Sequence, residues 1–304
     1  MGVRDIEVFR VVMNAGSTSK AAQVLGISQP AVSQSIRKLE SSAGLQLFHR
    51  AHGRLFPTEE ARALMIDVDK LFMGMDAIEH RIRSLKQFGT GRLAIAVHPL
   101  VGTAFMPRAL AAFDLAQRDV RVTLRVQSSR EVHQEVSAGL CDFGLMADEM
   151  PAVGLEHSEF LNESGVIALP EGHPLALKAS ISAEELGRHD FIALNPEDSS
   201  RRRLEVALDA EGIALKVRVE TAYLHTICNL VMRGLGIAFI NPLAAVDFVG
   251  RGLVVRPFDL DIRTRSLLVF RPGKPLSDNA RKLFATMRIQ LAKDLAAIRH
   301  HLAP

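Results

Sequence analysis

The sequence predicts an α/β protein that has an N-terminal all-α domain, a long linking helix and a two-lobed C-terminal domain. Three observations lead to this prediction. Two short amphipathic helices flank a tight turn within residues 17–40, a helix with a narrow apolar stripe follows over 58–88, and apolar strands alternate with helices after residue 92. A chain of 304 residues exceeds one ordinary domain, so two or three domains are expected.

Both short helices have recognisable start signals. Ser17 and Ser28 are each placed to cap a helix, because a side-chain oxygen at that position accepts from a backbone N–H that lacks an intrahelical partner. Pro30 falls in the first turn of the second helix, where no donor is lost. The turn between the helices is Gly26-Ile27-Ser28, so neither helix is long.

The second helix has two distinct faces. Val32, Ile36 and Leu39 recur at helical spacing and form an apolar face for a shared core. The opposite face carries polar and basic side chains of a length that reaches base edges in a DNA major groove. The alternative is a pair of ordinary surface helices whose polar face is only solvated. The candidate DNA-contacting residues of this helix are Ser28, Gln29, Pro30, Ser33, Gln34 and Arg37.

Charge favours the DNA-binding interpretation. Residues 1–57 hold seven Lys/Arg and three Asp/Glu, a net charge of +4, whereas the rest of the chain holds 30 basic and 31 acidic residues. Residues 49–56 form a short basic hairpin turned by Gly53, which we interpret as a wing along the DNA backbone. Arg50 and Arg54 are its candidate phosphate contacts. The segment 1–57 is therefore predicted to be a winged helix-turn-helix DNA-binding domain.

The helix over 58–88 is predicted to dimerise. Thr58 is placed to cap it, and Glu59 and Glu60 suit the positive end of its dipole. A strict a/d alternation follows, which is typical of a coiled-coil seam that one chain cannot satisfy alone. The alternative is a long helix lying on its own domain, which usually has a wider apolar face. The seam residues are Leu64, Val68, Leu71, Met75, Ile78, Ile82 and Leu85.

The segment 92–304 alternates strands and helices in a βαβαβ order. This order indicates a parallel sheet covered on both faces, with a ligand site beyond the carboxyl ends of the strands. A second such unit follows, and the strand at 266–271 and the helix at 277–295 are expected to return to the first unit. The predicted division is lobe I at about 92–162 and 266–304, and lobe II at about 163–265.

Loops at the strand ends supply candidates for a ligand site between the lobes. The serine pairs 128–129 and 199–200 begin helices whose free N–H groups favour a carboxylate or other anion, or they serve only as caps. His98 and His225 are placed to bind a ligand or are ordinary loop histidines, and the acidic pair 197–198 suits an amine or is solvated. The candidate effector residues are His98, Pro99, Leu100, Ser128, Ser129, Met146, Asn195, Ser199, Ser200, His225 and Thr226.

Composition argues against several protein classes. No apolar run approaches the ~18 residues that span a bilayer, and the N-terminus is charged where a secretory signal is apolar, so a cytoplasmic protein without membrane contact is expected. Cys141 and Cys228 lie far apart with no Cys/His spacing, so neither a disulfide framework nor a metal site is indicated. Nucleophile elbows, phosphate-binding glycine loops and cofactor lysine motifs are missing from the sequence. We therefore expect that the protein is not an enzyme and that it binds no cofactor.

Segments along the whole sequence carry a resemblance to one family. They are Phe9, Ala21, Ala22, Leu25, SQPAVSQSIRKLE at 28–40, Gly44, LFHR at 47–50, Thr58, ALPEGHPLA at 168–176 and VMRGLGIAFINP at 231–242. On these residues the chain resembles the LysR-type transcriptional regulators. Within that family, the segments 57–61, 224–248 and 253–258 are most similar to regulators of octopine and nopaline catabolism. Gln34 departs from the pattern, because many members have Arg there.

The resemblance implies a winged helix-turn-helix, a dimerising linker helix and a periplasmic-binding-protein-like effector domain of two lobes. It implies a transcriptional regulator that binds pseudo-palindromic double-stranded DNA as a homodimer or homotetramer, acts on RNA polymerase, and is controlled by a small molecule between the lobes. The effector is expected to be an opine, an amino acid or a carboxylate. The alternatives are a solute-binding protein, which the charged N-terminus argues against, and an enzyme with a DNA-binding appendage.

Overall fold

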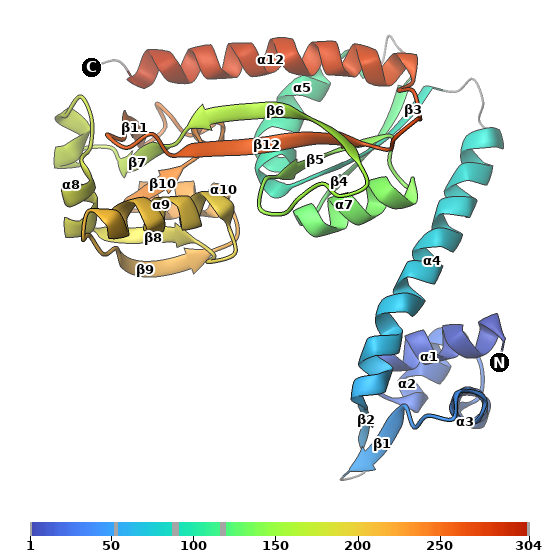
Figure 1. Cartoon of the computed structure of the whole chain (residues 1–304). Coiled ribbons are helices and arrows are strands. Elements are labelled where there is room, and N and C mark those ends of the chain that lie inside the picture. The colour runs from blue at the N-terminus through green and yellow to red at the C-terminus, as the bar shows by residue number, and fades with distance from the viewer. Residues whose placement is uncertain (1, 52–53, 87–90, 116–119, 303–304) are drawn as a thin grey trace. The chain divides into compact units, whose positions relative to one another are not determined.

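The structure is a computed structural model that divides into two compact units, Met1–Ser84 and Leu85–Pro304 (Figure 1). The first unit is mainly helical, and the second is built on β-sheets covered by helices. The residues that the structure describes are 2–51, 54–86, 91–115 and 120–302.

The first unit consists of three short helices, a two-stranded hairpin and one long helix. The strands of the hairpin are antiparallel, with Phe48 opposite Pro57 and Ala51 opposite Arg54. The predicted hairpin is therefore present, and its turn at Gly53 lies outside the described residues. In chain order the elements are α1 (Val3–Ala15), α2 (Thr18–Leu25), α3 (Gln29–Ala43), β1 (Phe48–Ala51), β2 (Arg54–Pro57) and α4 (Glu59–Lys86).

The predicted serine caps are confirmed. Ser17 Oγ accepts a hydrogen bond from the backbone N–H of Lys20 at 3.2 Å, and Ser28 Oγ accepts one from that of Ala31 at 3.4 Å. α2 ends at Gly26, whose φ of 63° lies in the left-handed region that glycine adopts without a steric penalty. The caps and this glycine therefore fix where α2 stops and α3 begins.

One apolar core holds the first unit together. The buried face of α3 is the one predicted from its spacing, α2 adds Ala21 and Ala22 to the same core, and the rings of Phe9 and Phe48 lie 5.8 Å apart within it. The beginning of α4 contributes to the same core. Its buried apolar residues are Val8, Phe9, Val12, Ala21, Ala22, Val32, Ile36, Leu39, Leu47, Phe48, Ala61 and Val68.

The second unit contains two groups of strands, which we call lobe I and lobe II. Lobe I is a five-stranded sheet in the order β4-β3-β5-β12-β6. β3 runs parallel to β4 and β5, whereas β12 is antiparallel to β5 and to β6. The expectation of a parallel sheet is therefore wrong for β12. This strand runs antiparallel to both of its neighbours, β5 and β6, and antiparallel pairing does not require the helical crossover that joins parallel strands. The strands are β3 (Gly91–Val97), β4 (Val120–Val126), β5 (Phe143–Ala147), β6 (Glu156–Ser164) and β12 (Arg263–Phe270).

Lobe II combines an antiparallel sheet in the order β10-β7-β11 with the parallel pair β8-β9. The expectation of a second parallel unit is therefore wrong for β7, β10 and β11, and among the described strands of this lobe only β8 and β9 pair in parallel. A single parallel bridge between Phe191 and Ile237 joins this pair to the antiparallel sheet. The sequence did not predict β11 of lobe II, nor did it predict β6 of lobe I. The strands of lobe II are β7 (Val166–Pro170), β8 (Asp190–Leu194), β9 (Lys216–Thr221), β10 (Ala238–Ile240) and β11 (Leu253–Pro257).

Helices cover both lobes. After β3 the chain forms a π-helical turn followed by a short α-helix that ends at Ala112, and residues 116–119 lie outside the described part. The helices are η1 (Val101–Phe105), α5 (Met106–Ala112), α7 (Ser129–Ala138), η2 (Pro174–Leu177), α8 (Ala183–Arg188), α9 (Ser199–Ala210), α10 (Leu224–Met232), α11 (Pro242–Ala245) and α12 (Asp278–Leu302).

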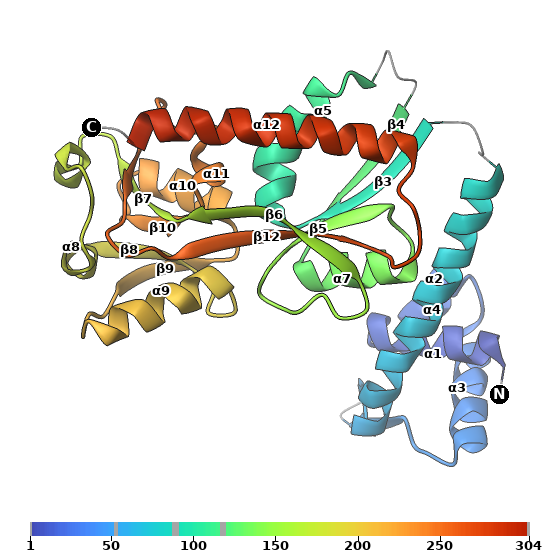
Figure 2. The same cartoon turned by 45° about the horizontal axis from the view of Figure 1, so that its top comes forward.

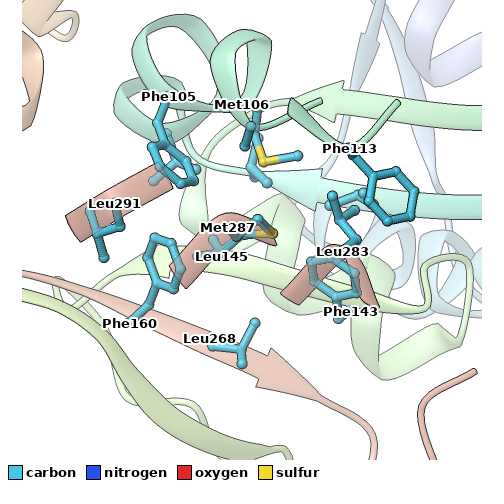
Figure 3. Packing of buried hydrophobic residues seen from close by; sticks show 14 of the residues in the cluster. Phe105, Met106, Phe113, Phe143, Leu145, Phe160, Leu268, Leu283, Met287 and Leu291 are labelled. Atoms are coloured by element: carbon cyan, nitrogen blue, oxygen red, sulfur yellow. The ribbon is translucent and has the colours of Figure 1, made fainter. Parts of the chain in front are cut away.

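The core of lobe I includes residues of its sheet, η1, α5 and α12 (Figure 3). The rings of Phe105 and Phe160 meet edge to face at 5.5 Å, and Met287 and Leu291 of α12 are buried in the same core. Near its end α12 also buries Ile298 in the core of lobe II. The last helix therefore returns to lobe I as expected, and it extends along lobe II as well (Figure 2).

Candidate nucleic-acid interface and interlobe cavity

The polar face of α3 is open to solvent. Gln34 and Arg37 are exposed, whereas the apolar face on the other side of the helix is buried. Ser28 and Pro30 at the start of the helix are exposed too, and Gln29 and Ser33 are half-buried. All six predicted residues are thus at least partly accessible to solvent.

Gln29 links the two helices of the motif. Its side-chain amide nitrogen donates to Ser33 Oγ at 2.8 Å and to Thr18 Oγ1 of α2 at 3.2 Å. These bonds orient the Gln29 amide before any ligand arrives. They also use both of its N–H groups, so the amide oxygen is the group left to accept a hydrogen bond from a base edge.

Few cations of the first unit are left unpaired. Arg4 and Arg10 form ion pairs within the unit, and Lys38 lies 3.4 Å from Asp5. Among the cations whose side chains the structure describes in this unit, Lys20 and Arg37 have neither an ion pair nor a side-chain hydrogen bond. Arg37 on α3 is therefore available to an incoming anion or base.

The hairpin is tied to α3 by a carboxylate. Glu40 Oε1 accepts hydrogen bonds from the backbone N–H groups of Leu47 at 2.8 Å and Phe48 at 3.1 Å. Sequence reasoning did not assign this role to Glu40. Arg50 and Arg54 belong to β1 and β2, and their side chains lie outside the described part of the chain.

The predicted seam on α4 divides into two parts. Val68 is 4% exposed and Leu64 is half-buried, and both pack on the core of their own unit. Val68 therefore does not face a partner. The remaining described seam residues are exposed, and the Leu85 side chain lies outside the described residues. The exposed stripe consists of Leu71, Met75, Ile78 and Ile82.

A cavity of about 670 Å³ lies between the two lobes, at the carboxyl ends of β3, β4, β5 and β8. Most of the predicted effector residues line it, together with polar residues that the sequence did not single out, such as Asp148, Glu149, Arg203 and Arg265. The predicted residues that line it are His98, Pro99, Leu100, Ser128, Ser129, Asn195, Ser199 and Ser200.

Three predicted residues do not line this cavity. Met146 is fully buried in a core beneath the sheet, because its side chain points to the opposite face of β5 from that of Ala147. His225 and Thr226 line a smaller adjoining cavity of about 250 Å³, which shares Tyr223 with the larger one.

His98 is a buried neutral side chain at the cavity wall. It is 6% exposed, and its Nε2 lies 2.9 Å from Ser266 Oγ of β12. Burial lowers the pKa of His98 from 6.5 to about 4, and the nearby Asp148 carboxylate opposes this shift without cancelling it. At neutral pH the ring is therefore uncharged and acts as a hydrogen-bonding group.

Asp148 joins the two lobes across the cavity. It follows β5 in lobe I, and it accepts from Ser199 Oγ at 2.5 Å and from Arg203 Nη1 at 2.9 Å, both on α9 of lobe II. Arg203 Nε also donates to the carbonyl oxygen of Arg263 at 2.9 Å. The sequence predicted Ser199 but missed Asp148 and Arg203, because their sequence separation hides the contact.

The helix starts at the cavity are capped by carboxylates as well as serines. Ser128 caps α7 and shares a capping box with Glu131, whose pKa these hydrogen bonds lower. α9 is capped by Asp198, which accepts from the backbone N–H groups of Ser200 and Arg201. The alternative that the serine pair 199–200 caps this second helix is therefore wrong, because Asp198 precedes the pair and takes the cap position.

Other chemistry is sparse in the described part of the chain. Gln127 lines the cavity, and its side-chain nitrogen is buried without a hydrogen-bond partner, which costs about 1–3 kcal/mol unless a ligand acceptor satisfies it.

Both cysteines are buried, and burial raises the pKa of the Cys228 thiol to about 12. Groups of three or more metal-ligating side chains are not found among the described residues. The same residues include no helix long and apolar enough to cross a membrane.

Two family models match the chain. "Bacterial regulatory helix-turn-helix protein, lysR family" matches residues 3–62, and "LysR substrate binding domain" matches residues 86–292. The fold is also that of full-length CbnR, a LysR family regulator whose crystal structure with its target DNA aligns with a TM-score of 0.67 and 17% identity. That alignment covers 97% of this chain and 100% of the CbnR chain.

Curated relatives extend over most of the sequence. Transcriptional activator protein LysR of Escherichia coli (strain K12) is 35% identical over 279 residues, which cover 91% of this chain and 90% of the relative. The octopine catabolism/uptake operon regulatory protein OccR of Rhizobium meliloti is 33% identical over 266 residues, which cover 86% of each. The resemblance to opine regulators is thus confirmed at the level of sequence similarity. This chain belongs to the LysR family of bacterial transcriptional regulators.

Proposed function

We propose that α3 reads base edges in the major groove, with Gln29, Ser33, Gln34 and Arg37 as the reading side chains. The observation that carries the proposal is the exposed polar face of α3 opposite its buried face. Arg37 is unpaired among the described residues, so DNA binding breaks no existing ion pair at this position. An Arg side chain that forks onto guanine contributes about 1–3 kcal/mol of base discrimination.

Backbone contacts accompany base reading in this proposal. Ser28 and Pro30 lie at the exposed N-terminus of α3, where a phosphate meets the positive end of the helix dipole. Arg50 and Arg54 on the hairpin strands are the proposed phosphate contacts of the wing. The DNA-binding domain is taken as residues 1–57.

The exposed stripe on α4 is the proposed dimer contact, within a linker of residues 58–88. Four large apolar side chains at a/d spacing remain uncovered in the monomer, and a second copy of the helix covers them in a coiled coil. A twofold dimer presents two copies of α3 to the half-sites of a pseudo-palindrome. Homodimer and homotetramer are both compatible with this contact, and contact with RNA polymerase is part of the same proposal.

A small molecule in the interlobe cavity is the proposed effector. The cavity volume suits a metabolite, and residues of both lobes line it, so a ligand that prefers one lobe angle shifts the population toward that angle. The predicted residues that line the cavity remain the proposed effector contacts, and Met146 is not among them. OccR, which is named for octopine catabolism, is a relative at 33% identity, so opines, amino acids and carboxylates are the first molecules to screen. The effector domain is taken as 92–304, and the regulator is proposed to act in the cytoplasm without catalysing a reaction.

The test is a titration of the full-length protein against the intergenic DNA upstream of its own gene. Specific binding that weakens steeply with rising salt supports the proposal, since each neutralised phosphate releases counterions. Arg37→Ala should weaken this binding by about tenfold or more. Arg188→Ala, an exposed substitution on α8, is the matched control and should bind as the wild type does.

Binding that does not prefer this DNA over random DNA contradicts the proposal. Equal affinity of Arg37→Ala and the wild type at fixed salt would remove Arg37 from the base-reading residues. The proposed role of the other reading residues of α3 would not be affected.

A further inference from the structure

Carboxylates outnumber cationic groups around the interlobe cavity. Two guanidinium groups line it, those of Arg203 and Arg265. Five carboxylates line the same space, and they come from both lobes. They are Glu131, Asp148, Glu149, Glu197 and Asp198.

Three of these carboxylates are already used within the protein. Asp148 is paired with Arg203 at 2.9 Å, and Glu131 accepts from Ser128 Oγ at 2.7 Å. Asp198 accepts from the first N–H groups of α9. The N-termini of α7 and α9 therefore already hold a carboxylate of the chain, so an anionic ligand at either of them meets like charge. α10 also begins at the cavity, with Tyr223 and Leu224, and no described side chain caps its N-terminus.

The other charged groups at the cavity have no partner. Glu149, Glu197 and Arg265 make neither an ion pair nor a side-chain hydrogen bond with any described residue. Glu149 follows β5 in lobe I, Glu197 precedes α9 in lobe II, and Arg265 is an exposed residue of β12. Two free negative charges and one free positive charge thus remain for a ligand.

We propose that the effector is a dibasic amino acid, with its two cationic groups on Glu149 and Glu197 and its carboxylate on Arg265. This inference rests on the proposed function, because it takes the cavity as the effector site. Each of the three free side chains receives an opposite charge, and charge-assisted hydrogen bonds of this kind are the stronger ones. A dicarboxylate offers one suitable contact and two repulsive ones.

The placement of the two glutamates also gives the ligand a way to act on the lobes. Glu149 and Glu197 belong to opposite lobes and both line the cavity, so approach of the lobes without a ligand would bring two negative charges closer together, and like charges repel. A ligand with a cation at each glutamate removes that repulsion and adds attraction to both sides. Such a ligand binds more tightly to the approached state and therefore shifts the population toward it.

The probes are chosen to separate charge from shape. The full-length protein is titrated by calorimetry and by thermal shift with L-lysine, L-ornithine and L-arginine. The analogues L-norleucine and L-citrulline, whose side chains are uncharged, and the anions L-glutamate and succinate are titrated in parallel. At least one dibasic amino acid should bind about tenfold or more tightly than its analogue with the uncharged side chain and should raise the Tm. Tighter binding of a neutral or anionic probe, or no binding of any dibasic one, overturns the inference.

Charge-removing variants locate the contacts. Glu149→Gln and Glu197→Gln should each lower the affinity for the dibasic probe by about tenfold. Glu184→Gln removes an equal charge at an exposed position on α8 and should leave that affinity unchanged. Wild-type affinity in both cavity variants overturns the inference.

Operator binding is measured on the same samples without a probe. If the protein binds its operator but binds the anionic probes more tightly than the dibasic ones, only the dibasic effector is refuted. A protein that binds neither the operator nor any probe refutes the proposed function itself.

Discussion

Arg108 of α5 forms a two-point ion pair with Asp294 of α12. Its Nε and Nη2 donate to Asp294 Oδ2 at 3.1 and 2.9 Å, and the Asp294 side chain is only 5% exposed. The third guanidinium nitrogen, Nη1, donates to Asp247 just after α11 at 2.6 Å. One side chain thus fastens the last helix to α5 and to the segment that follows α11.

Removal of this arginine should be costly. Arg108→Met keeps much of the side-chain volume but leaves the Asp294 carboxylate buried without its cation, so we expect a loss of about 3–5 kcal/mol in the free energy of unfolding. Urea denaturation measures the loss. Arg188→Ala breaks an exposed pair and should cost about 1 kcal/mol or less. Equal stability of the two variants would show that the buried pair is not a determinant of stability.

The exposed stripe on α4 offers a matched pair of substitutions. Ile78 lies on the stripe and Ile66 lies off it, and both are 62% exposed. Ile78→Glu should dissociate the dimer because it places like charges opposite each other in the proposed seam, whereas Ile66→Glu should not. Light scattering at micromolar concentration measures the mass. A dimer that survives Ile78→Glu, alone and combined with Ile82→Glu, contradicts the seam.

Local features of the fold were predictable from the sequence, and long-range pairings were not. Ser17 and Ser28 cap their helices as predicted, because a cap depends on neighbours within three residues. The antiparallel place of β12 was missed, because it depends on β5 and β6, which lie about a hundred residues earlier in the chain. β6 itself was missed because its sequence, EHSEFLNES, is largely polar and exposed, so no apolar alternation marks it.

The cavity shows the same division. Residues 98–100 and 128–129 were predictable because they follow strands whose carboxyl ends share one edge of the sheet. The contact of Asp148 with Arg203 joins side chains 55 residues apart on different lobes, and no sequence spacing encodes it. Met146 was wrongly chosen for a different reason, since successive side chains on a strand point to opposite faces and only its neighbour Ala147 reaches the cavity.

Two glycines in the turn before β10 should respond differently to the same change. Gly236 has a φ of 152°, and a Cβ there would lie 2.6 Å from the carbonyl oxygen of Asp190, so Gly236→Ala should destabilise the protein by about 4 kcal/mol. Gly234 has a φ of 75° with open space around its Cβ position, so Gly234→Ala should cost only about 1–2 kcal/mol. Thermal denaturation compares them. Similar Tm values for the two variants would contradict the close approach of Gly236 to β8.

His98 should make the stability of the protein depend on pH in a defined window. Its pKa is about 4 in the folded protein and 6.5 as the reference for the unfolded chain. Above pH 6.5 the ring is neutral in both states, so His98 adds no pH dependence. Between pH 6.5 and 4 the unfolded chain binds a proton that the folded protein does not, so stability falls with falling pH, by about 3 kcal/mol in all.

The variant His98→Asn isolates this effect from the carboxylates that titrate in the same range. Urea unfolding is measured from pH 7 to pH 4 for the wild type, for His98→Asn and for His157→Asn, whose histidine is exposed on β6. His98→Asn is expected to be less stable at pH 7, because the contact with Ser266 is lost, and to have a shallower decline toward pH 4. His157→Asn should follow the wild-type slope. A decline in His98→Asn as steep as in the wild type would mean that the buried imidazole takes up its proton as easily in the folded protein as in the unfolded chain.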